Sequence, residues 1–285
     1  MIKIEHTVFS APFMLSAMLL SAEDSWPEWQ TFFWAGVALF GARSSAMSLN
    51  RLIDAKFDKL NPRTANREIP SGQLKSKTVF LMSIMGFVVM LLAALNLPII
   101  CLKLLPIAII WLSFYSYTKR FTFLCHLVLG IAIAGAVLGG WLAVSGSFHL
   151  VAFLLALAVC FWVMGFDILY ALQDSSFDKG VQLHSIPVKF GHKAAINISK
   201  TSHLGSIVFF LLTGFFAHKL LSVSIIELIG LWIGLLIACL GLIYQQISLK
   251  KDLSNINKIF FNANAWVSSL FFMSLLLFKT MSHFF

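Results

Sequence analysis

The chain has 285 residues, of which 59% are hydrophobic and only 12% are charged. Soluble domains carry roughly 25% charged residues, so the composition excludes an ordinary soluble protein. The apolar runs of about 20 residues lack the period-two alternation of barrel strands, which leaves helices as the spanning elements. The sequence therefore predicts an all-α, polytopic membrane protein. We attribute its net charge of +9 to loops at a membrane surface and expect no nucleic-acid partner.

Hydrophobic runs bounded by polar clusters predict about nine membrane-spanning helices. The first run is interpreted as a helix rather than a signal peptide, because Glu5 and His6 interrupt its basic start. No soluble domain or low-complexity linker separates the runs, so residues 1–285 are expected to form one membrane domain. The predicted helices span residues 7–22, 29–49, 78–97, 99–116, 122–144, 149–170, 203–221, 225–246 and 260–279.

The Lys and Arg residues are distributed unequally between the two sides that these helices define. Before the first helix and in the loops after the second, fourth, sixth and eighth helices lie 17 of the 21, whereas the other side carries three. By the positive-inside rule, the N-terminus and the two long polar loops, residues 50–77 and 171–202, face the cytoplasm. The expected location is a bacterial plasma membrane, with the active site at its cytoplasmic face.

The first long loop opens with polar residues at helical spacing. Asn50, Asp54 and Asp58 recur every four residues, so they share one face of a helix. Two carboxylates one turn apart can bind a hard cation, and Mg²⁺ is usually held by one or two carboxylates together with phosphate oxygens. Arg63 and Arg67 follow, as a phosphate site requires. The segment therefore predicts a metal ion that is bound together with a phosphorylated substrate.

Residues 167–191, the second aspartate motif, repeat the logic of residues 50–72, the first aspartate motif. Its polar side chains stand at i, i+3, i+7 and i+11 and are Asp167, Tyr170, Asp174 and Asp178. An ionised aspartate inside a bilayer costs on the order of 3 kcal/mol, so such carboxylates require metal ions, basic partners or water. The alternative is that both sets are solvated helix ends. His184 and Ser185 are expected to cap or order this loop rather than catalyse.

Three further basic residues are candidates for substrate binding. Lys119 and Arg120 could neutralise the charge of a bound phosphate, although setting the membrane topology would explain them equally well. Arg43 lies inside an apolar helix, seven residues before Asn50 and hence on nearly the same helical face. An arginine within a membrane segment is a candidate functional residue. We interpret it as a partner of Asp54 or as the site for an acceptor's carboxylate.

Both motifs resemble the signatures of the UbiA superfamily of membrane prenyltransferases. NRLIDAKFD, followed by NPRTANREIPSG, is similar to the first signature, and DILYALQDSSFD, continued by LHSIPVKFG, is similar to the second. The opening IKIEHTVFSAPF and the segment YSYTKRFT resemble the branch of the superfamily that acts on aromatic acids. The resemblance implies a UbiA-type helical bundle that transfers a polyprenyl chain from its diphosphate to an aromatic ring in quinone biosynthesis, with Mg²⁺ as the cofactor.

The resemblance also implies roles for individual residues. The residues expected to arrange the metal ions and the diphosphate are Asn50, Asp54, Asp58, Asp174 and Asp178, of which the four aspartates count as catalytic. Asp167 and Tyr170 are expected to support the second motif. The basic positions near the diphosphate or the acceptor are Arg63, Arg67, Lys119 and Arg120.

Several acceptors are compatible with this pattern. The usual acceptor of the branch is 4-hydroxybenzoate, on the path to ubiquinone. NPRTANRE together with DILYALQD and LHSIP resembles a subgroup that prenylates 1,4-dihydroxy-6-naphthoate on a route to menaquinone. A haem or chlorophyll prenyltransferase needs room for a macrocycle, and the aromatic-acid opening argues against it. The alternative from another class is a membrane transporter, whose charges should lie near the bilayer midplane rather than at one face.

Overall fold

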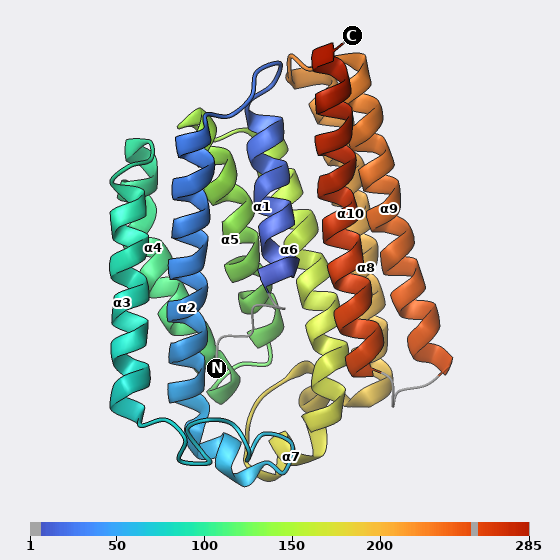
Figure 1. The fold of residues 1–285 in the computed structure, drawn as a ribbon. Coiled ribbons are helices and arrows are strands. Elements are labelled where there is room, and N and C mark those ends of the chain that lie inside the picture. The colour runs from blue at the N-terminus through green and yellow to red at the C-terminus, as the bar shows by residue number, and fades with distance from the viewer. Residues whose placement is uncertain (1–6, 252–255, 285) are drawn as a thin grey trace.

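The structure, a computed structural model, describes residues 7–251 and 256–284. Every element within these ranges is helical, and nine of the α-helices have 15 or more residues (Figure 1). The helices are α1 (Thr7–Ser21), α2 (Trp29–Leu60), α3 (Ser76–Ala94), α4 (Ile99–Phe114), η2 (Tyr115–Arg120), α5 (Cys125–Ser145), α6 (Leu150–Ala171), η3 (Leu172–Asp174), α7 (Ser175–Gly180), α8 (Ile186–Leu220), α9 (Ile225–Lys251) and α10 (Ile256–Phe284).

Seven of the described helices are long and apolar enough to cross a membrane. Two more helices run alongside them. They are α1, whose apolar part is Phe9–Ser21, and α2, a continuous helix whose apolar sequence is interrupted by Arg43 and several serines. The prediction of an all-α, polytopic bundle is confirmed. The charge count used to orient it includes Lys3, Lys250, Lys251 and Lys258, whose side chains lie outside the described part of the structure.

Two helices, α2 and α8, extend more than ten residues beyond the hydrophobic runs that predicted them. The predicted end of α2 was residue 49, but the helix continues to Leu60, so the first part of the predicted loop is helical. α8 begins at Ile186 rather than at residue 203, with a kink at Gly191, whose φ of 79° is readily adopted only by glycine. The boundaries differ because hydropathy detects apolar spans and not the polar extensions of a helix, which bury only one face.

α6 is the most buried membrane span, and it packs between α5 and α8. Aromatic rings from four helices meet in the core. The ring of Phe13 on α1 lies 5.1 Å from that of Trp162 on α6 and 5.1 Å from that of Phe271 on α10, with Phe210 on α8 at 6.0 Å. These contacts join the first and last helices of the chain to the centre of the bundle.

α2 and α3 approach each other closely at Gly41 and Gly86. A Cβ atom on Gly86 would lie 2.8 Å from the carbonyl oxygen of Gly41. Beside them, Ser45 Oγ on α2 donates a hydrogen bond of 2.8 Å to the carbonyl of Ser83 on α3. Small residues and interhelical hydrogen bonds are the usual means of packing helices in lipid, where helix contact gains no hydrophobic driving force.

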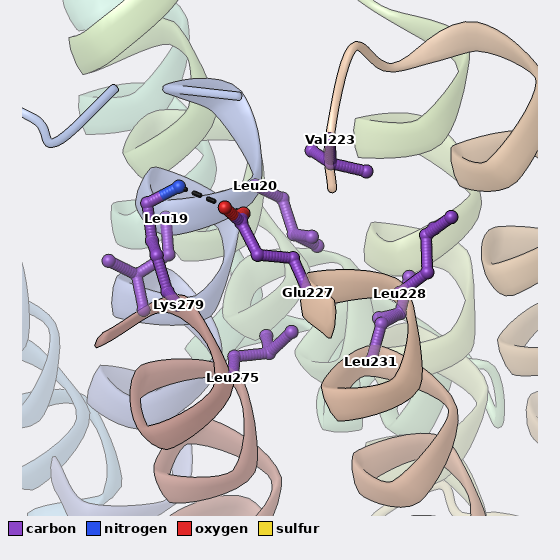
Figure 2. A pocket seen from close by; sticks show the side chains of 8 residues that line it. All are labelled: Leu19, Leu20, Val223, Glu227, Leu228, Leu231, Leu275 and Lys279. Atoms are coloured by element: carbon purple, nitrogen blue, oxygen red, sulfur yellow. Dashed lines mark hydrogen bonds and ion pairs between the residues drawn. The ribbon is translucent and has the colours of Figure 1, made fainter. Parts of the chain in front are cut away.

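A largely buried ion pair lies at one end of the bundle. Lys279 on α10 is 3% exposed, and its Nζ lies 3.0 Å from Glu227 Oε2 on α9 and also donates to the carbonyl of Glu23 after α1. Figure 2 shows the pair together with the leucines that line a cavity next to it. The cavity volume is about 10 Å³, which is room for roughly one water molecule. The aspartate motifs lie at the opposite end, where the segment after α2 meets α7 (Figure 1).

Candidate active site

The first aspartate motif begins as the last turns of α2 and then folds back on itself. Asn50 Nδ2 donates to Asp54 Oδ2 at 2.9 Å, one turn away as the spacing predicts. Asp58 is buried, and Nη1 of Arg67 lies 2.7 Å from both of its carboxylate oxygens. Thr64 Oγ1 donates to the main-chain carbonyl of Asp58 at 3.1 Å, which pairs a carbonyl left free at the helix end. The turn after α2 thus places Arg67 against Asp58.

The four polar residues that define the second aspartate motif lie in three successive helical elements. Asp167 and Tyr170 lie on α6, Asp174 in the 3-10 helix η3, and Asp178 on α7. The spacing of these four residues is therefore not that of one continuous α-helix, because a 3-10 turn winds more tightly than an α-helix. Asp174 and Asp178 are both buried, and Oδ2 of Asp178 has no hydrogen-bond partner among the described residues. This buried oxygen therefore has no protein partner with which a ligand would compete.

Arg63 connects the two motifs. Its Nε donates to Asp174 Oδ1 at 2.9 Å, its Nη2 contacts Oδ2 of the same carboxylate, and its Nη1 donates to the hydroxyl of Tyr170 at 2.9 Å. Asn61 Nδ2 donates to Asp174 Oδ1 at 3.2 Å, while Asn61 Oδ1 accepts from the N–H of Arg63 at 3.0 Å. Burial acts to lower the pKa of Arg63, but its hydrogen bonds raise that pKa above the usual value, so the side chain stays charged.

Lys119 and Arg120 follow α4 in the 3-10 helix η2. Nη2 of Arg120 donates to the carbonyl of Ile53 at 2.6 Å and lies 3.8 Å from Asp54 Oδ1. Its guanidinium carbon also lies 5.4 Å from the centre of the Phe57 ring, so Arg120 docks η2 against α2. The carboxylates whose charge acts on Lys119 are those of Asp178, Asp167 and Asp54. Arg120 therefore lies beside the first aspartate motif, and the neighbouring Lys119 is attracted by the carboxylates of both motifs.

Arg43 lies further inside the bundle on α2. Its Nη2 contacts the sulfur of Met47 at 3.7 Å, and its Nε is buried without a hydrogen-bond partner among the described residues. The expected pairing of Arg43 with Asp54 is not formed, because Asp54 is engaged by Asn50 and approached by Arg120. The other interpretation, a site for an acceptor's carboxylate, stays a prediction.

Asp167 contacts the buried His126 on α5, whose Nδ1 lies 2.6 Å from Asp167 Oδ2.

Two residues of the second motif order the chain as expected. Ser185 Oγ accepts from a backbone N–H in the first turn of α8 at 3.3 Å and so caps that helix. The N–H of His184 donates to the carbonyl of Lys119 at 2.6 Å, which fastens the loop before α8 to η2.

Asn61 and His126 are the site residues that the sequence analysis missed. Asn61 follows α2 directly and stands three residues after Asp58 and seven after Asp54, a helical spacing that was a signal for it. Its contact with Asp174, however, depends on the turn that it begins. His126 also carried a signal. It is an ionisable residue within an apolar run, and such residues in membrane segments are candidate functional residues by default.

The donor set of the two motifs fits a hard cation that is bound together with substrate. Among the described residues no three or more Asp, Glu, His or Cys side chains form a cluster that could hold a metal ion alone. Asp58 and Asp174 face arginines, whereas Asp178 keeps an unpaired oxygen. Burial raises the pKa of Asp54 to about 6, and a neighbouring cation would lower it again. Mg²⁺ fits, because it needs only one or two carboxylates and takes other oxygens from phosphate and water.

The structure is thus a polytopic helical bundle with two carboxylate motifs and arginines gathered at one end. The chain belongs to the UbiA prenyltransferase family, whose model matches residues 10–276. It is therefore an integral membrane enzyme of the class that transfers alkyl groups.

Individual relatives agree with this assignment. The chain is 29% identical over 243 residues to a 4-hydroxybenzoate octaprenyltransferase of Marinomonas sp. (strain MWYL1), covering 81% of this chain and 78% of that protein. It is 34% identical over 181 residues to the enzyme of the same name from Enterobacter sp. (strain 638), covering 62% and 61%.

Solved structures show the same fold. The apo structure of a UbiA homologue from Aeropyrum pernix K1 has a TM-score of 0.86 and 28% identity, covering 97% of this chain and 99% of that one. A UbiA homologue from Archaeoglobus fulgidus bound to DMAPP and Mg²⁺ has a TM-score of 0.76 at 14% identity, covering 98% and 97%. The second likeness supports the fold alone.

Proposed function

We propose that this protein transfers a polyprenyl group from polyprenyl diphosphate to the ring of an aromatic acid, in a reaction that depends on Mg²⁺. The observation that carries the proposal is the contact of Arg63, in the first aspartate motif, with Asp174 and Tyr170 in the second. It gathers carboxylates suited to a metal ion and guanidinium groups suited to a diphosphate at one end of the bundle. Relatives named as 4-hydroxybenzoate octaprenyltransferases support an aromatic acid as the acceptor.

The proposed ligands of the metal ion are Asn50, Asp54, Asp58, Asp174 and Asp178. When bound, Mg²⁺ would withdraw electron density from the diphosphate, so that the bond between carbon and oxygen can ionise. Arg63 and Arg67 each hold one carboxylate in the free protein. In the proposed complex they donate to diphosphate oxygens, because arginine can make the same paired hydrogen bonds to phosphate and to carboxylate. Lys119 and Arg120 neutralise the remaining negative charge.

The acceptor is proposed to approach Arg43. This guanidinium is half-buried, and no carboxylate pairs with it among the described residues. An acceptor's carboxylate would therefore form an ion pair with it. A hydroxyl on the acceptor ring makes the ortho carbon nucleophilic. That carbon then bonds to the allylic carbon of the donor as the diphosphate leaves, and the ring loses a proton.

The proposed acceptor is 4-hydroxybenzoate, with a prenylated benzoate of the ubiquinone pathway as the product. The alternative is 1,4-dihydroxy-6-naphthoate, favoured by the likeness of NPRTANRE, DILYALQD and LHSIP to the menaquinone subgroup. The proposed location is a bacterial plasma membrane, with the aspartate motifs toward the cytoplasm, because the loops at their side carry most of the basic residues. The lipid donor would then enter from the bilayer and the soluble acceptor from the cytoplasm.

The test is product formation by membranes that contain the protein. They are given a polyprenyl diphosphate and Mg²⁺, with either 4-hydroxybenzoate or 1,4-dihydroxy-6-naphthoate, and parallel samples receive EDTA. A prenylated benzoate that disappears with EDTA supports the first acceptor, and a prenylated naphthoate supports the alternative. The absence of a metal-dependent product with either acceptor would overturn the proposal and favour a macrocycle prenyltransferase or a transporter.

A further inference from the structure

His126 is a fully buried histidine at the start of α5, and it contacts two other helices. Its Nδ1 lies 2.6 Å from Asp167 Oδ2 on α6. The backbone N–H of Ile186, at the start of α8, is directed at its Nε2 at 3.4 Å. One side chain therefore ties together three segments that are distant in the sequence.

The residues that precede His126 make further connections to the same part of α8. The carbonyl of Lys119 accepts from the N–H of His184 at 2.6 Å. The Sγ of Cys125 lies 3.6 Å from the carbonyl oxygen of His184. The chain between Lys119 and His126 is thus attached to residues 184–186 at three points, which fixes the loop between α7 and α8 against η2.

These contacts also fix the backbone at Lys119. Its carbonyl is bonded to the N–H of His184, and Lys119 directly precedes Arg120, which approaches Asp54. Removal of His126 would leave the carboxylate of Asp167 and the N–H of Ile186 without this partner. Buried polar groups that lose a partner are costly, so the segments that His126 joins would be free to shift.

We propose that His126 is a positioning residue for the diphosphate site: it fixes Asp167 and the start of α8, so that η2 with Lys119 stays in place beside the second aspartate motif. The inference rests on the proposed function, because the diphosphate is the ligand that Lys119 would meet there. In this arrangement His126 touches neither the substrate nor the metal ion. Groups that orient the residues of a site in this way typically contribute about 10- to 100-fold to affinity or activity.

The experiment compares two substitutions at the same position. His126→Phe keeps a ring but removes both nitrogens, whereas His126→Gln retains a donor for Asp167 and an acceptor for the N–H of Ile186. For His126→Phe we expect kcat/KM to fall about 10- to 100-fold, through a higher KM for polyprenyl diphosphate and an unchanged KM for the acceptor. For His126→Gln we expect values within about threefold of wild type.

Two further measurements separate positioning from general loss of stability. Hydrogen–deuterium exchange should become faster at the amides of residues 183–188 in His126→Phe and stay slow in His126→Gln. The control is Lys279→Met, which removes a buried charge at the opposite end of the bundle. It should lower the melting temperature and leave the KM for the donor unchanged.

The inference is overturned if His126→Gln is no better than His126→Phe, or if His126→Phe lowers the melting temperature without raising the KM for the donor. If the wild-type protein transfers no prenyl group, the proposed function fails separately. Binding of Mg²⁺ and pyrophosphate then decides the inference. Weaker binding by His126→Phe than by His126→Gln supports it, and equal binding refutes it.

Discussion

Arg63 and Asp174 are 111 residues apart in the sequence, yet Arg63 Nε donates to Asp174 Oδ1 at 2.9 Å and Nη2 contacts the second oxygen of the same carboxylate. Such a pair is strong because the planar guanidinium matches the carboxylate with two parallel hydrogen bonds. It links the turn after α2 to the 3-10 helix after α6. The two halves of the candidate site are therefore joined directly by protein side chains.

Arg63→Lys should weaken binding of the donor. Lysine keeps the positive charge but cannot make two parallel hydrogen bonds to a carboxylate or to a phosphate. We expect the KM for polyprenyl diphosphate to rise about tenfold, roughly 1.4 kcal/mol of binding free energy, with a smaller change in kcat. Steady-state kinetics in detergent or nanodiscs measures both. The matched control is Lys77→Arg, at an exposed position at the start of α3, and an equal effect of the two substitutions would refute the role of the paired geometry.

Asp54→Ala and Asp174→Ala should each reduce prenyl transfer at least about 100-fold, because each removes a proposed metal ligand rather than an outer partner of one. Neither change removes much packing, so the protein should remain in the membrane. Product assays and membrane fractionation measure the two effects. Asp24→Ala, in the exposed turn after α1, is the control and should be fully active. Near-normal turnover in either motif variant would contradict the assignment.

Gly86→Ala should destabilise the contact between α2 and α3. The added Cβ would lie 2.8 Å from the carbonyl oxygen of Gly41 and 2.9 Å from the N of Ser45, so the helices must separate. Overpacking of this kind costs about 1–3 kcal/mol. The control is Gly36→Ala on α2, where a Cβ meets no atom within 4 Å. Unfolding in mixed detergent should be easier for the first variant and unchanged or harder for the second.

Lys279→Met should destabilise the protein by about 3–5 kcal/mol, because it leaves the carboxylate of Glu227 buried without its charged partner (Figure 2). The double variant Lys279→Met with Glu227→Leu should recover most of this loss, since a well-packed apolar pair can replace a buried ion pair. Thermal unfolding of both variants measures the difference. If the single variant were as stable as the double, Glu227 would not depend on Lys279.

The sequence by itself determined the fold class and most members of the candidate site. Long apolar runs predict spanning helices because lipid leaves the backbone no other partner for its hydrogen bonds. The spacing of Asn50, Asp54 and Asp58 predicts that they share one helical face. The hydrogen bond between Asn50 and Asp54 joins two of these residues, one helical turn apart. Helical periodicity is a local property, so it can be obtained from the order of residues alone.

Only the tertiary structure decided which charges meet. Arg67 turns back to Asp58, Arg63 reaches Asp174, and these pairings depend on turns whose course no periodicity describes. The polar first half of α8 is helical because one face packs against α6, where Ser199 Oγ donates to the carbonyl of Gly165 at 2.7 Å. A contact between distant segments follows from the packing of whole helices, so the partners of His126 and Arg63 became evident only when α2, α5, α6 and α8 were placed together.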